Sequence, residues 1–193
     1  MLMRLELETR SYHADADRTW IELLDRYVTP ADYAARLVRV FGFEAPLEAA
    51  LAYTPHLTTL VELRPRFRSG LIAHDLIALG RRPSEVATLP QCMIAPFRGI
   101  AEALGWLYVM ERATLLHGAV HRRLVAHLEL APACAYVTAY EGVVGARWEE
   151  LGRMLDSFGR AAPVQQQIIT AARDAFTCAI DWHQGAVPRR ARA

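Results

Sequence analysis

The chain has 193 residues, of which 53% are hydrophobic and 22% are charged. This composition is typical of a soluble globular protein and excludes disordered and collagen-like chains, and a chain of this length can bury roughly 70% of its unfolded surface in one core. The formal net charge is +1, with all 22 basic residues being arginine, so no basic field points to nucleic acid or to an anionic membrane.

Apolar residues recur at helical spacing almost everywhere, and no stretch keeps the alternation of a half-buried strand. The predicted fold class is therefore all-α. The first predicted helix carries an apolar stripe from Leu5 to Leu24 and ends near Tyr27. At the other end of the chain, residues 188–193 are expected to form a frayed tail.

A second helix is predicted to begin at the sequence Thr29-Pro30-Ala31-Asp32, which combines an N-cap with proline in the first turn. It continues past Pro46, where we expect a kink, to Leu51. A third helix is predicted from Phe67 to Leu79, with Gly80 as its C-cap glycine. A loop is expected over residues 81–96.

The pattern is helical throughout residues 97–128. A straight helix of that length would span about 48 Å, more than the roughly 40 Å diameter of a compact chain of this size, so we expect a bend. Gly105 and Gly118 are the candidate positions for it. Two further helices are predicted over residues 146–158 and 164–183.

No apolar run approaches the roughly 20 residues of a membrane span, and the opening residues alternate leucine with charge. We therefore expect a cytoplasmic protein. The cysteines Cys92, Cys134 and Cys178 are widely spaced and odd in number. This pattern favours buried or idle thiols over a disulfide framework or a thiolate zinc site.

Six segments carry a family resemblance when they are taken in chain order: residues 9–13 (TRSYH), 29–33 (TPADY) with 46–48 (PLE), 71–80 (LIAHDLIALG), 103–111 (ALGWLYVME), 146–148 (ARW) and 171–176 (AARDAF). In this order and spacing the chain resembles the heme oxygenase family, specifically its compact bacterial members. The resemblance implies a heme oxygenase-like helical bundle that forms a single domain over residues 1–187.

The resemblance also implies a heme site. His13 matches the proximal iron ligand, which leaves the opposite face of the iron for O2. Asp17 lies one helical turn further on, where a carboxylate can fix the imidazole tautomer. Arg147 matches a basic residue for a heme propionate, and Phe176 matches an apolar residue of the pocket. Without the resemblance, His13 would be interpreted as a partly exposed helix histidine. For Phe176, plain packing in the core explains the residue at least as well as a place in the pocket.

The activity that the resemblance implies is binding of heme and its oxidative cleavage to biliverdin, iron and carbon monoxide. O2 and electrons from a reductase partner would drive the reaction. One family position departs unfavourably, because Glu6 stands where members commonly carry a basic residue. Arg4 or Arg10, on neighbouring turns, could replace that charge.

The second departure affects the distal helix, where the family has the pattern G-S-T-L-G-G. Here the same place reads Arg112-Ala113-Thr114-Leu115-Leu116-His117, so Arg112, Leu116 and His117 replace all three glycines. Glycine lets the helix backbone approach the heme face and bend over it. These larger residues predict an altered distal wall that either closes the pocket or moves the helix outward, and they leave the catalytic residues unknown.

Two alternatives to an enzyme follow from these departures. If His117 faces His13, both imidazoles could ligate the iron of a non-catalytic heme binder or sensor. The second alternative is a cofactor-free protein on the same scaffold that acts by contacting other proteins. His117 and His121 also form an i, i+4 pair that could ligate a metal, although Arg122 and Arg123 beside them favour a solvated helix surface.

Overall fold

The computed structural model describes residues 1–25 and 27–185, and these residues form helices without any strand. The predicted all-α fold is therefore confirmed, whereas the predicted tail, 188–193, lies outside the described residues. The longer helices are α1 (Leu2–Ile21), α2 (Pro30–Ala52), α3 (Ser69–Ala78), α5 (Ile100–Arg112), α6 (His117–Leu128), α8 (Val144–Phe158) and α9 (Ala162–His183). The described helices include none that is long and apolar enough to cross a membrane.

The predicted start of α2 is confirmed in detail. The Thr29 hydroxyl accepts a hydrogen bond from the Asp32 N–H at 3.3 Å, and the Asp32 carboxylate accepts one from the Thr29 N–H at 2.8 Å, which completes a capping box. Pro46 lies inside α2, which continues to Ala52. After α3, Gly80 adopts φ +93°, the left-handed conformation expected of a C-cap glycine.

Two predictions for the middle of the chain were right only in part, since most of the expected loop and the expected interruption of the long helix are present. The expected loop over residues 81–96 contains the short helix α4 (Pro83–Ala87), at whose start the Glu85 carboxylate accepts a hydrogen bond from the Arg82 N–H at 2.8 Å. The long helix breaks at neither predicted glycine, since the 3-10 segment η4 (Ala113–Leu116) separates α5 from α6. Gly105 instead permits packing, because a Cβ there would lie 2.6 Å from the Ile168 carbonyl oxygen of α9.

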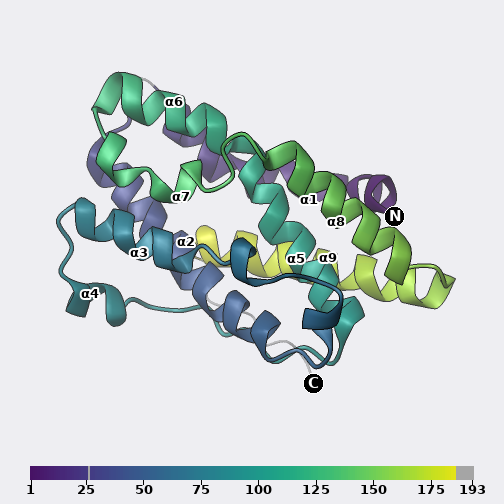
Figure 1. The fold of residues 1–193 in the computed structure, drawn as a ribbon. Coiled ribbons are helices and arrows are strands. Elements are labelled where there is room, and N and C mark those ends of the chain that lie inside the picture. Colours follow the sequence, from purple (N-terminus) through teal and green to yellow (C-terminus); the bar gives the residue numbers. More distant parts are fainter. Residues whose placement is uncertain (26, 186–193) are drawn as a thin grey trace.

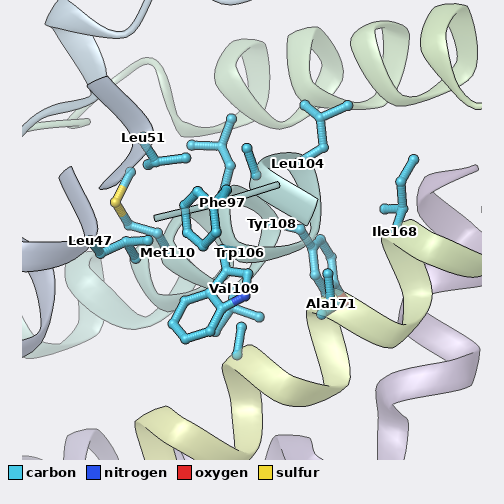
Figure 2. Close-up of a cluster of buried hydrophobic side chains, with 14 of the residues drawn as sticks. Leu47, Leu51, Phe97, Leu104, Trp106, Tyr108, Val109, Met110, Ile168 and Ala171 are labelled. Atoms are coloured by element: carbon cyan, nitrogen blue, oxygen red, sulfur yellow. The ribbon is translucent and has the colours of Figure 1, made fainter. Parts of the chain in front are cut away.

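The helix α5 lies at the centre of the molecule and packs against α9, which in turn packs against α1 (Figure 1). Figure 2 shows the buried side chains of α5, among them Leu104, Tyr108 and Val109, gathered with Ile168 and Ala171 of α9. The C-terminal part of α2, with Phe43, Leu47 and Leu51, joins the same core.

A second hydrophobic core lies between α2, α3, α6 and the short helix α7 (Ala135–Thr138). Its buried members include Trp20, Val120 and Tyr136, so it also receives the end of α1. The helix α1 therefore spans both cores. It packs against α9, α8 and η4, and the Thr9 hydroxyl lies 3.3 Å from the Tyr108 hydroxyl of α5.

Candidate functional site between α1 and the distal segment

We call α5, η4 and α6 together the distal segment. The space between this segment and α1 is the slot. His13 projects from α1 at its edge and lies 5.6 Å from the ring of Phe176, measured between ring centroids. Its Nε2 is 3.1 Å from the Thr9 hydroxyl, which lies 2.7 Å from the Leu5 carbonyl and donates its proton there. Thr9 therefore accepts from His13, and this nitrogen already has a partner.

The protonation state of His13 follows from its surroundings. Partial burial, and then the positive charge of Arg112, lower the pKa of His13, while Asp17 acts in the opposite direction. Because the ordinary pKa of histidine is about 6.5, this imidazole is neutral at pH 7.

Arg112 crosses the slot and binds Asp17 in a bidentate ion pair. Its Nη1 and Nη2 donate to the two carboxylate oxygens at 2.7 and 2.8 Å. The arginine is 13% exposed and the aspartate 20%. Asp17, which we expected to orient His13, is thus engaged by a residue at the position of a family glycine. The guanidinium also lies 6.0 Å from the ring centroid of Phe176.

His117 is fully enclosed, with 2% of its surface exposed. Its ring lies 5.2 Å from that of Trp20 and 4.7 Å from that of Tyr136, between centroids. Neither ring nitrogen has a hydrogen-bond partner among the described residues. Burial, and then the positive charges of Arg68 and Arg36, hold the pKa of His117 well below its ordinary value.

Two expectations about His117 are thereby corrected. The interpretation as a solvated surface was wrong for His117, because α6 begins at this residue and its ring packs against Trp20 and Tyr136, whereas His121 is partly exposed. His117 and His13 also do not face each other. The contact of His117 is Trp20, which is seven residues or about 10 Å further along α1. Among the described residues, no third metal-ligating side chain joins the pair of His117 and His121.

The other predicted residues have structural partners. Arg147 donates to Glu150 at 3.1 Å and lies over the ring of Tyr140 at 5.8 Å. None of the ion pairs or ring contacts of Arg147 within the described chain reaches His13. Phe176 is 1% exposed, and it both packs in the core and lines the slot. Leu116 packs against the second core.

A small cavity of about 50 Å³ lies in the slot, and a more open hollow shares Arg36 with it. The walls of the small cavity come from α1, α2, α5, η4, α7 and α9 and include Asp17, Trp20, Arg36, Glu44, Arg112 and Phe176. Sites for drug-sized molecules measure roughly 300–1,000 Å³, whereas a single water needs roughly 10–15 Å³. The cavity therefore has room for a few waters or for one small ion.

Sequence reasoning missed two charged residues in this wall. Arg36 is 7% exposed, stacks 4.6 Å from the Trp20 ring, and has no ion-pair partner among the described residues. Its Nε lacks a hydrogen-bond partner, and burial lowers its pKa to about 10. The sequence could have identified Arg36, because it is an arginine that stands between Tyr33 and Val40 within the apolar stripe of α2.

Glu44 is the second missed residue. One carboxylate oxygen, Oε1, accepts from the Tyr136 hydroxyl at 2.5 Å and from Arg68 at 3.1 Å, but Oε2 has no partner. Burial raises the pKa of Glu44 to about 7. Arg36 has no direct ion-pair partner among the described residues, but the negative charges of Glu44 and Glu22 act on it and oppose the lowering of its pKa by burial.

A comparison with protein families gives one result. The model of the heme oxygenase family matches residues 1–185, which is nearly the whole chain. The search of curated proteins gave no match.

Proposed function

Because this chain belongs to the heme oxygenase family, we propose that it is a member whose heme slot is closed, and that its remaining cavity holds a small anion instead of heme. The observation that carries the proposal is the bidentate ion pair between Arg112 and Asp17 inside the slot. The proposal excludes the family's cleavage of heme for the conformation described here.

Heme does not fit the space between α1 and the distal segment. The cavity of about 50 Å³ is several times smaller than the range found for small-molecule sites, and a porphyrin is larger than most molecules in that range. To make room, Arg112 would have to leave Asp17, and the partly buried carboxylate would lose two charge-assisted hydrogen bonds. The ring of His117 likewise occupies space in the slot, beside the ring of Trp20.

The guanidinium of Arg36 determines the kind of ligand. It lines the cavity without a direct ion pair and its Nε lacks a hydrogen-bond partner, so the cavity favours an anion of the size of formate, nitrate or bicarbonate, which would add to the compensation that Glu44 and Glu22 give at a distance. The carboxyl group of Glu44, with its pKa near 7, carries a proton part of the time at neutral pH. In that state it can donate a hydrogen bond to the same anion.

Heme binding is the second candidate function, and one observation favours it. The imidazole of His13 is neutral at pH 7, which is the form that ligates iron, and Phe176 lies beside it. In this candidate His13 would hold the iron, Asp17 would orient it once released from Arg112, and Arg147 would bind a propionate. Bound heme would supply the oxidative ring cleavage to biliverdin, with electrons from a reductase.

A hemin titration separates the two candidates. Hemin is added to the wild type, to the variant R112G/L116G/H117G, which restores the three family glycines, and to that variant with H13A added. We expect no saturable Soret band from the wild type. The glycine variant should gain one because the ion pair and the enclosed imidazole are gone, and the additional loss of His13 should weaken it.

A stoichiometric Soret band in the wild type that H13A removes would overturn the first proposal in favour of heme binding. The anion is tested separately, by titrating nitrate and formate at constant ionic strength and following Tm. We expect a saturable rise for the wild type that R36Q abolishes. An equal rise in both proteins would contradict an anion site at Arg36.

A further inference from the structure

Two cysteines that lie far apart in the chain meet in the fold. The sulfur atoms of Cys92 and Cys178 are 3.5 Å apart, although the residues differ by 86 in number. Cys92 is buried in the segment between α4 and α5, and Cys178 is partly buried on α9. The third cysteine, Cys134, has a local partner instead, since its thiol donates to the Leu130 carbonyl at 3.2 Å.

The backbone on both sides of this thiol pair is anchored to α2. The N–H of Cys92 donates to the Gly42 carbonyl at 2.7 Å, and Trp182 of α9 donates from its indole nitrogen to the Arg39 carbonyl at 2.8 Å. Gly42 permits this approach, because a Cβ there would lie 2.4 Å from the Pro90 carbonyl oxygen and 2.6 Å from the Trp182 ring. The sulfur contact is therefore set by the packing of three segments.

We propose that Cys92 and Cys178 form a reversible disulfide that responds to peroxide and fastens the segment between α4 and α5 to α9. The sulfurs would have to approach by about 1.5 Å to reach the disulfide length of about 2.05 Å. The proposal does not depend on what the slot binds, because neither cysteine lines the cavity there.

Either sulfur can donate to the other across this contact. The contact lowers the pKa of Cys92, and the same contact, followed by burial, raises that of Cys178. In the proposed order the Cys92 thiolate attacks the oxidant and Cys178 resolves, and the reverse order gives the same disulfide. Cys92 is buried, so a small oxidant such as hydrogen peroxide suits it better than a bulky disulfide.

The chemistry balances with peroxide as the oxidant. The Cys92 thiolate attacks one peroxide oxygen, the O–O bond breaks, and the departing hydroxide takes up a proton to leave as water. The Cys178 sulfur then attacks the sulfenic sulfur of Cys92, the S–O bond breaks, and the leaving hydroxide takes the Cys178 proton as a second water. Both thiols are oxidised, one peroxide is reduced, and an external dithiol reverses the step.

The test uses the full chain, treated with one equivalent of hydrogen peroxide and then alkylated without reduction. We expect a mass loss of about 2 Da before alkylation, with only Cys134 alkylated, and a cross-linked peptide that joins Cys92 to Cys178. The bond closes a long loop, so Tm should rise by about 5–10 °C and return after treatment with dithiothreitol.

The matched variants are C92S, C178S and C134S. The first two should neither lose mass nor gain Tm, whereas C134S should behave as the wild type does. Mass gains of about 16 or 32 Da without a cross-link would overturn the proposal, because they would mean that the thiols oxidise separately. A cross-link to Cys134 would overturn it as well.

Discussion

At the scale of single residues, the proposed function depends on the residues that stand in place of three family glycines. Arg112 takes the place of the first glycine and pairs with Asp17, while His117 takes the place of the last and is enclosed by Trp20 and Tyr136. Each side chain thus uses space that the family motif keeps free with glycine. The sequence predicted a closed or displaced wall, and the ion pair of Arg112 with Asp17 is the contact on which we base the proposed closure.

The enclosure of His117 makes the stability of the protein depend on pH. The pKa of His117 is held well below 6.5 in the folded chain, so below pH 6.5 the unfolded chain binds a proton that the folded chain excludes. Stability contributed by the neutral imidazole is present above pH 6.5 and is lost as the pH falls. His183, whose pKa is also held low by burial, acts in the same direction, and Glu44, with its raised pKa, acts in the opposite one.

We therefore predict that H117Q loses part of this pH dependence. Between about pH 6.5 and pH 5, its free energy of unfolding should fall less steeply than that of the wild type, by up to ~1.4 kcal/mol per pH unit, the value for one proton. Urea unfolding at several pH values measures the two slopes. Equal slopes for H117Q and the wild type would contradict the lowered pKa, because they would mean that His117 takes up its proton in the folded chain over the same pH range as in the unfolded chain.

At the scale of elements, the apolar periodicity and the cap residues predicted most of the helices. Thr29 with Pro30 marked the start of α2 and Gly80 the end of α3, because both signals act within one turn. The break at η4 could not be predicted, since residues 113–116 contain neither glycine nor proline. The pairing of Asp17 with Arg112 joins residues 95 apart in the chain, which local patterns do not encode.

Gly105 illustrates how one residue fixes the distance between two elements. A methyl group there would lie 2.6 Å from the Ile168 carbonyl oxygen and 2.7 Å from both the Ala171 Cβ and the Ala172 nitrogen. These atoms belong to the backbone and the first side-chain atom of α9, so they cannot move alone. The close packing of α5 on α9 therefore requires glycine at this position.

We predict that G105A destabilises the fold by about 2–3 kcal/mol through overpacking. G70A is the matched control, because Gly70 lies in α3 and a Cβ there meets no atom within 4 Å. In that helix alanine should be neutral or stabilising by up to ~1 kcal/mol. Urea denaturation compares the variants, and equal stability of G105A and wild type would contradict the close approach.

At the scale of the whole molecule, the chain has the helical fold and the family membership that its ordered motifs predicted. Those motifs reside mainly in packing and capping residues, which a protein keeps in order to fold. In the function we propose, the space for the cofactor depends on a few glycines and closes while the fold persists. On that proposal the fold and the function of the site are determined by different residues.

A reductant-driven turnover assay on the wild-type protein tests the closed slot most directly. Hemin is supplied with a reductase or ascorbate in air, and biliverdin is followed by its absorbance, with R112G/L116G/H117G assayed beside it. The closed slot predicts that the wild type forms no biliverdin beyond the rate of free hemin. Formation of biliverdin by the wild type, and its loss in H13A, would contradict the closure of the slot by Arg112 and Asp17.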